Sequence, residues 1–109
     1  MRKAKRFVAE NLGDRIALED VAKHSGVSTF YFCKVFKAST GMCFTEYVNR
    51  VRVEKAKALL NHPEHRITEV AYAVGFQSLS QFNRSFQKYA GESPTEFRRR
   101  IRGEEAVAA

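Results

Sequence analysis

Apolar residues along this chain recur at the spacing of α-helices. Leu18, Val21 and Ala22 mark one face of a short helix that ends near Gly26, a residue that tolerates the left-handed conformation. No segment shows the strict alternation of apolar and polar residues that a half-buried strand requires. The pattern therefore predicts an all-α fold.

A second helix follows this glycine directly. Ser28 can cap its start, and Phe32, Val35 and Phe36 line its apolar face. A short helix, a turn that contains glycine and a second helix together make a helix-turn-helix motif. We therefore expect one such motif in the first half of the chain.

The same pattern returns about fifty residues later. The offset between equivalent residues is 49 up to the turn and 50 beyond it, because one residue is added after the second glycine. Two copies of one supersecondary unit are the simplest interpretation. Equivalent pairs include Val21 and Val70, Ala22 and Ala71, Gly26 and Gly75, Phe32 and Phe82, Phe36 and Phe86, and Gly41 and Gly91.

A long amphipathic stretch, residues 45–62, separates the two copies. Eighteen helical residues are roughly 27 Å long, and Pro63 ends the helix because proline disfavours helix at the residue before it. The residues expected on its apolar stripe are Tyr47, Val48, Val51, Ala58 and Leu59.

Weaker signals mark the two ends of the chain. Residues 2–11 predict an opening helix, and Ser93 with Pro94 opens a last helix whose basic run, Arg98 to Arg102, we interpret as a phosphate-facing or solvated helix end. The expected organisation is a first helix-turn-helix subdomain over residues 1–43, a linker helix over 44–62, a second subdomain over 63–102 and a frayed tail over 103–109.

Composition adds a partner class to this picture. The chain has 109 residues, with 19 Lys and Arg against 12 Asp and Glu, for a formal net charge of +7. The length allows one compact domain or two very small ones, and it excludes a (β/α)₈ barrel. The charge favours a polyanionic partner, with nucleic acid ahead of an acidic membrane surface.

The outward face of the second helix in each copy carries the candidate chemistry. In the first copy this face holds Phe30, Cys33, Lys34 and Lys37, and in the second it holds Ser80, Asn83, Arg84 and Gln87. Lys or Arg can pair with guanine, and Asn or Gln with adenine, in the major groove. An ordinary solvated helix face is the alternative, but the duplicated turn and the net charge favour base reading. Phe30 either lies partly in the core or contacts a thymine methyl group.

Glycines, aromatic residues and a Ser-Pro pair recur at fixed spacing through the chain. They are Gly26-Val27-Ser28, Phe36-Lys37, Gly41, Arg52-Val53-Glu54-Lys55-Ala56 and Leu59-Leu60, then Ile67-Thr68-Glu69-Val70-Ala71, Val74-Gly75-Phe76, Phe82, Arg84, Phe86-Gln87-Lys88, Gly91, Ser93-Pro94 and Phe97-Arg98. On these motifs the chain, from about residue 5 to residue 102, resembles the AraC/XylS family of bacterial transcription regulators, most closely in its second half.

The resemblance implies a domain of about seven helices, in which a long central helix joins two helix-turn-helix units that read successive major grooves of double-stranded DNA. The implied base-contacting residues are Phe30, Cys33, Lys34, Leu79, Ser80, Asn83 and Arg84. The expected phosphate contacts are Lys37, Arg50, Ser78 and Lys88. Because Cys33 replaces a polar base reader and Ala17 replaces a capping residue, direct readout is expected mainly in the second unit.

Other chemistry finds little support in the sequence. His62 and His65 lie across a helix end and predict no metal site. Cys33 is either a redox-sensitive thiol or, as we prefer, a free small residue. Without a paired nucleophile and base or a phosphate-binding glycine loop, the sequence predicts neither an enzyme nor a cofactor.

The sequence also suggests where the protein works and which partners other than DNA it has. Two cysteines and the lack of a signal peptide or an apolar span indicate a cytoplasmic, nucleoid-associated protein with no membrane partner. RNA polymerase and an N-terminal sensor domain outside this chain are further candidate partners. The alternative function is a helical protein-interaction module that docks an acidic partner. The operator, the effector and the direction of control stay open, as does whether the chain is complete or a C-terminal fragment.

Overall fold

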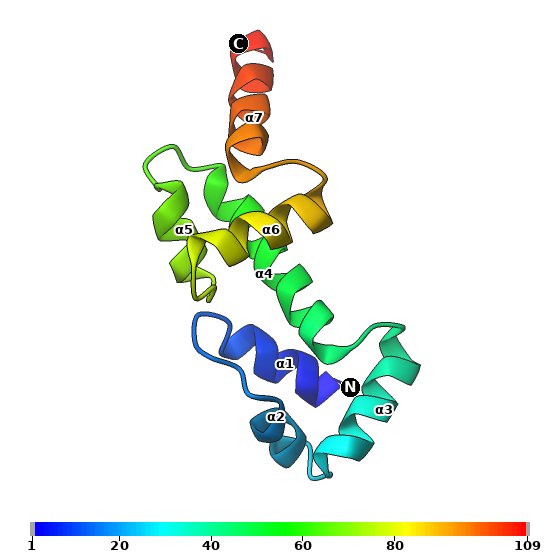
Figure 1. Ribbon diagram of the computed structural model, residues 1–109. Helices are drawn as coiled ribbons and strands as arrows, with labels where there is room; N and C mark the ends of the chain where they lie inside the picture. Colours follow the sequence, from blue (N-terminus) through cyan, green and yellow to red (C-terminus); the bar gives the residue numbers. More distant parts are fainter. Residues whose placement is uncertain (1, 109) are drawn as a thin grey trace. The chain divides into compact units, whose positions relative to one another are not determined.

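The computed structural model describes residues 2–108, with side chains for residues 2–102. Within that part of the chain the fold consists of helices without strands (Figure 1), which confirms the predicted all-α class. The seven helices are α1 (Arg2–Glu10), α2 (Leu18–His24), α3 (Thr29–Thr40), α4 (Phe44–Leu60), α5 (Ile67–Ala73), α6 (Leu79–Ala90) and α7 (Pro94–Ala108).

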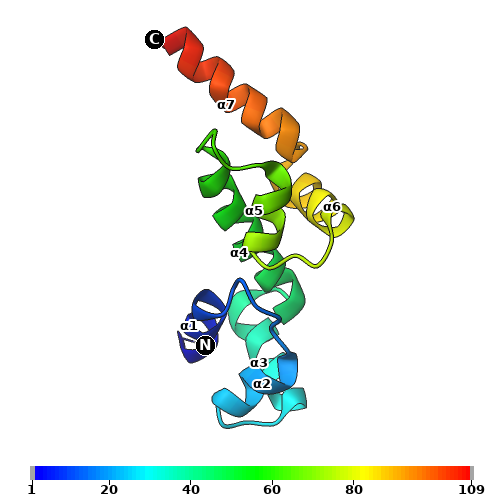
Figure 2. The same cartoon turned by 90° about the vertical axis from the view of Figure 1, so that its left-hand side faces the viewer.

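The chain forms two compact units, Met1–Val51 and Arg52–Ala109. The first unit contains α1, α2, α3 and the first part of α4. In the second unit, α5 and α6 lie beside the second part of α4, and α7 follows α6 (Figures 1 and 2). The boundary falls within α4, so the residues that the sequence assigns to a separate linker helix contribute to both units.

Aromatic rings form the centre of the core in the first unit. Phe44 meets Phe32 and Phe36 of α3 nearly edge-on, with ring centroids 5.5 and 5.4 Å apart. Phe36 also meets Tyr47 at 5.3 Å. Edge-to-face pairs of this kind stabilise a core beyond the area they bury. These pairs pack one face of α3 into the core, so its opposite face is exposed. Helices α1 and α2 complete this core with Ala4, Val8, Val21 and Ala22.

The second unit repeats this arrangement with its own phenylalanines. Phe82 of α6 lies 5.4 Å from Phe76, and Phe86 lies 5.5 Å from Phe97, centroid to centroid. The half-buried guanidinium of Arg52 lies 5.9 Å from the Phe76 ring centroid, and burial lowers the pKa of Arg52. The aliphatic part of this core consists of Val53, Ala56, Leu60, Val70, Ala71 and Val74.

The buried face of α4 differs from the one predicted. The single stripe proposed from the sequence includes Ala58, which is exposed, and Leu59, which is only partly buried. The residues of α4 that are buried in the second core are instead Val53, Ala56 and Leu60. The prediction fails because each half of α4 packs against a different core, so the two halves bury different stripes.

Glycine and serine stand at the turns as the sequence predicts. Gly26 and Gly75 have positive φ angles of 77° and 103°, a conformation that favours glycine. The Oγ atoms of Ser28 and Ser78 accept hydrogen bonds from the backbone N–H three residues later, at 3.2 and 3.1 Å. Ala17 gives α2 no side-chain cap. The second helix of each unit therefore has a capped start.

Arg98 in α7 binds the turn between α4 and α5. Its Nε donates to the carbonyl oxygen of Leu60 at 3.4 Å, and its Nη2 donates to that of His62 at 3.2 Å and to that of His65. A guanidinium suits this position because its fixed fork of donors can serve several carbonyls left unpaired at a helix end. Arg98 thus joins α7 to the end of α4.

The predicted role of the basic run is accordingly wrong for Arg98, which faces the protein. Burial lowers the pKa of Arg98 and Arg102 acts in the same direction, while Glu64 opposes them. Arg100 forms an ion pair with Glu92 at 2.9 Å. The backbone stays helical over residues 103–108, where the sequence predicts a frayed tail. Fraying itself stays a prediction, and residue 109 lies outside the described residues.

Removing the cap of α6 should destabilise the protein measurably. In Ser78→Ala the Gln81 N–H loses its acceptor, so we expect the free energy of unfolding in urea to fall by about 1 kcal/mol. Ser80→Ala, on the exposed face of the same helix, should change it by less than about 0.5 kcal/mol. Equal effects of the two substitutions would contradict the capping role.

Arg98 should contribute more to stability than its neighbour in sequence. Arg98→Ala leaves three carbonyl groups without this donor, and we expect a loss of about 1.5–3 kcal/mol in the free energy of unfolding. Arg98→Lys should be nearly as damaging because one ammonium cannot reproduce the fork of donors. The matched control is the exposed Arg99→Ala, and a loss as large as that of Arg98→Ala would refute the assignment.

Candidate nucleic-acid interface

The outward face of α3 carries an aromatic ring beside a positive charge. Phe30 is 74% exposed, which settles its position in favour of solvent over the core. The Nζ atom of Lys34 lies 5.5 Å from the centroid of the Phe30 ring, within the range of a cation–π interaction. Cys33 is exposed on the same face. The three base-contact candidates of the first unit therefore share one accessible surface.

This surface is concave next to the charges. Cys33, Lys34, Lys37 and Ala38 line a shallow hollow of about 430 Å³. Lys37 lies in the last turn of α3, where a cation is also favoured by the helix dipole. The hollow therefore combines two ammonium groups with a small apolar floor.

The outward face of α6 is more polar. Leu79 is 37% exposed, and Ser80, Asn83 and Arg84 are all exposed. Among the described residues, the side chains of Asn83 and Arg84 make no hydrogen bond or ion pair. Both groups are thus available to a ligand without first breaking a contact in the protein.

The three phosphate candidates other than Lys37 occupy different kinds of position. Lys88 lies in the last turn of α6, with its Nζ 5.3 Å from the Tyr89 ring centroid. The Ser78 hydroxyl accepts the capping hydrogen bond described above and keeps its own hydrogen to donate. Arg50 lies on α4 and pairs with Glu46 at 3.3 Å, so a phosphate would have to compete with this carboxylate.

Two exposed aromatic side chains escaped the sequence interpretation. Tyr31 and Tyr72 are 57% and 51% exposed. Tyr72 adjoins Ala71 but falls outside the stripe of Val70, Ala71 and Val74, so helical spacing was sufficient to predict that it is exposed. Tyr31 follows Phe30 and lies beside the apolar face of α3, where spacing alone cannot distinguish burial from exposure.

Metal and membrane chemistry gain no support from the described residues. Over that part of the chain, no group of three or more His, Cys, Asp or Glu side chains could hold a metal ion. No helix there is both long and apolar enough to cross a membrane.

Known proteins resemble the chain over most of its length. A helix-turn-helix domain family of the AraC type matches residues 21–100. The regulatory protein PocR of Salmonella typhimurium is 38% identical over 101 residues, which cover 93% of this chain and 33% of PocR. The melibiose operon regulatory protein of Escherichia coli is 31% identical over 93 residues, which cover 85% of this chain and 31% of that protein. The chain thus spans about a third of the length of these relatives.

Solved structures agree with this similarity. The DNA-binding domain of AdpA, a global transcriptional factor, was solved in complex with a target DNA. It aligns with a TM-score of 0.89 and 25% identity over 94% of this chain and 93% of that one. The C-terminal domain of the response regulator AraT from Geobacillus stearothermophilus aligns with a TM-score of 0.84 and 32% identity. The alignment covers 90% of this chain and 82% of that domain's chain.

The relatives are transcription regulators rather than enzymes, and they do not favour the alternative of an acidic-partner docking module. The family match over residues 21–100 includes α3, α5, α6 and both turns, and all of α2 except its first three residues. The chain belongs to the AraC/XylS family of transcription regulators and forms a DNA-binding helix-turn-helix domain of that family.

Proposed function

We propose that α3 and α6 enter successive major grooves of double-stranded DNA and read its sequence together. The observation that carries this proposal is the recurrence of one exposed stripe on the second helix of each helix-turn-helix unit. The proposed base contacts are Phe30, Cys33, Lys34, Leu79, Ser80, Asn83 and Arg84. The AdpA domain, solved with its target DNA, supports a fold of this kind acting on DNA.

Helix α6 supplies the hydrogen-bonded part of the readout in this proposal. The Arg84 guanidinium can donate two parallel hydrogen bonds to guanine O6 and N7, and the Asn83 amide can bind adenine N6 and N7. Neither side chain has a competing polar partner among the described residues. Arg84 therefore carries the largest share of specificity.

Helix α3 contributes chiefly apolar and electrostatic contacts. The exposed Phe30 ring suits the methyl group of a thymine. Lys34 supplies a charge near the same ring, while Cys33 offers a small apolar contact. The first unit accordingly adds affinity and a preference for thymine more than a full pattern of hydrogen bonds.

Phosphate contacts supply most of the affinity and its dependence on salt. Lys37, Ser78 and Lys88 lie at the ends of the two reading helices, and Arg50 joins them once it exchanges Glu46 for a phosphate. Binding releases the counterions condensed on the phosphates, so removing one charged contact by mutation should reduce the magnitude of the slope of log affinity against log salt concentration by about one.

The whole protein, we propose, works in the cytoplasm on the nucleoid, with a sensor domain before this chain and RNA polymerase as a partner. The share of the relatives that the chain covers supports the sensor domain, since PocR extends well beyond the aligned third. The AraT domain likewise comes from the C-terminus of a response regulator.

Arg84→Ala tests the proposed function most specifically. Gel-shift titration should show a loss of about 1–3 kcal/mol on a selected site and a smaller loss on random genomic fragments. Lys88→Ala is the matched control on the same helix and should weaken both kinds of DNA alike. An equal loss on both kinds for Arg84→Ala would refute its role, and no retardation of any DNA at low salt would refute the function.

A further inference from the structure

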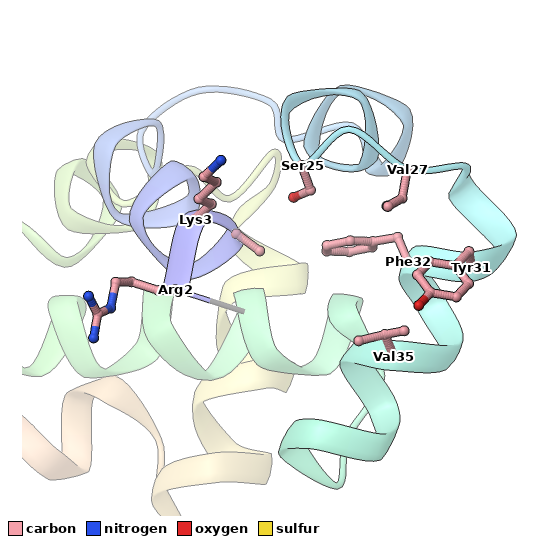
Figure 3. A pocket seen from close by; sticks show the side chains of 8 residues that line it. Arg2, Lys3, Ser25, Val27, Tyr31, Phe32 and Val35 are labelled. Carbon is pink, nitrogen blue, oxygen red and sulfur yellow. The ribbon is translucent and has the colours of Figure 1, made fainter.

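A second hollow lies in the first unit, away from the outward stripe of α3. Its volume is about 350 Å³, within the range of small-molecule sites. The start of α1 faces α3 and the turn before it across this hollow (Figure 3). Its apolar lining consists of Ala4, Val27, Tyr31, Phe32 and Val35.

This lining leaves apolar surface in contact with water. Phe32 is buried, but Val27 and Val35 are only partly so and Tyr31 is 57% exposed. The Tyr31 ring stacks on no other ring and its hydroxyl binds no group among the described residues. A ligand with a flat apolar body would therefore gain the hydrophobic effect here without displacing a contact of the protein.

The charged residues around the hollow favour a ligand with negative charge. Arg2 and Lys3 line it from α1, and none of its described lining residues is acidic. Figure 3 shows their charged ends turned away from the apolar side chains. Both residues are exposed, so rotation of the long side chains can bring the charges onto an anion at the mouth. Arg6, one turn later, is by contrast paired with Glu10 at 3.6 Å.

The internal repeat shows that this surface belongs to the first unit alone. The positions equivalent to Tyr31 and Val35 are Gln81 and Ser85, and Ser85 is only 9% exposed. Both members of the pair have polar side chains in the second unit. An apolar lining is therefore no general requirement of the helix-turn-helix fold.

We propose that the hollow binds a small amphipathic organic acid. Its apolar body packs against Tyr31 and Val35, and its carboxylate turns toward Arg2 and Lys3. Val35 lies on the opposite side of α3 from Cys33 and Lys37, whereas Tyr31, three residues before Lys34, lies at the border of the two surfaces. The acid and DNA occupy offset parts of α3, and we expect them to bind the chain together. The site does not depend on the proposed base contacts.

Titration of the intact chain with 2-naphthoate tests this site. We expect a dissociation constant of about 0.1–1 mM by calorimetry. Amide shifts in nitrogen-15 spectra should gather at Ser25, Val27, Tyr31 and Val35. The neutral 2-naphthamide should bind about three- to tenfold more weakly, because the two cations are exposed and each ion pair is modest. Acetate, which lacks the apolar body, should not bind measurably at these concentrations.

Substitutions and competition separate this site from the DNA surface. Tyr31→Ala, at an exposed position, should weaken 2-naphthoate binding about tenfold, while Gln81→Ala at the equivalent position should leave it unchanged. The double change Arg2→Gln and Lys3→Gln should remove the preference for the acid over the amide. Saturating duplex DNA at low salt should leave the affinity within about threefold. Shifts gathered at Lys34, Lys37 or Arg84, or displacement by DNA, would overturn the proposal.

Discussion

Helix α4 supplies side chains to both hydrophobic cores, and each helix-turn-helix unit depends on that supply. Phe44 and Val48 are buried in the first core, whereas Val53, Ala56 and Leu60 are buried in the second. No glycine or proline interrupts the sequence between Phe44 and Leu60, so one run of backbone hydrogen bonds serves both halves. A unit of about fifty residues buries too little surface to be robust alone, and its share of α4 adds buried side chains to its core.

The inward phenylalanines decide which side chains face outward. Phe32 and Phe36 are almost completely buried in α3, as Phe82 and Phe86 are in α6. Since an α-helix repeats every 3.6 residues, burying residues at i and i+4 leaves the opposite stripe accessible. The candidate base contacts follow from this constraint, because Lys34 and Arg84 each lie two residues after the first buried ring. In each of these helices, one face thus packs in the core and the opposite face carries the candidate base contacts.

Local signals in the sequence were sufficient for much of this structure. The glycines with positive φ and the caps at Ser28 and Ser78 each act within a few residues, so spacing alone reveals them, and the repeat shows that the same local signals occur twice. The divided apolar face of α4 escaped because it depends on which core each half meets. The role of Arg98 escaped for the same reason, since its partners at Leu60, His62 and His65 lie more than thirty residues away. Exposure of Phe30 required the packed core to be known.

In the proposed function, both units of this one chain read DNA sequence. Selecting bound fragments from a pool of random duplex DNA, followed by sequencing, tests it directly. If both helices read bases in successive grooves, the enriched site contains two conserved blocks about 10 base pairs apart, centre to centre. A single short conserved block would show that only one unit reads bases, and the absence of any enriched sequence would contradict sequence-specific binding altogether.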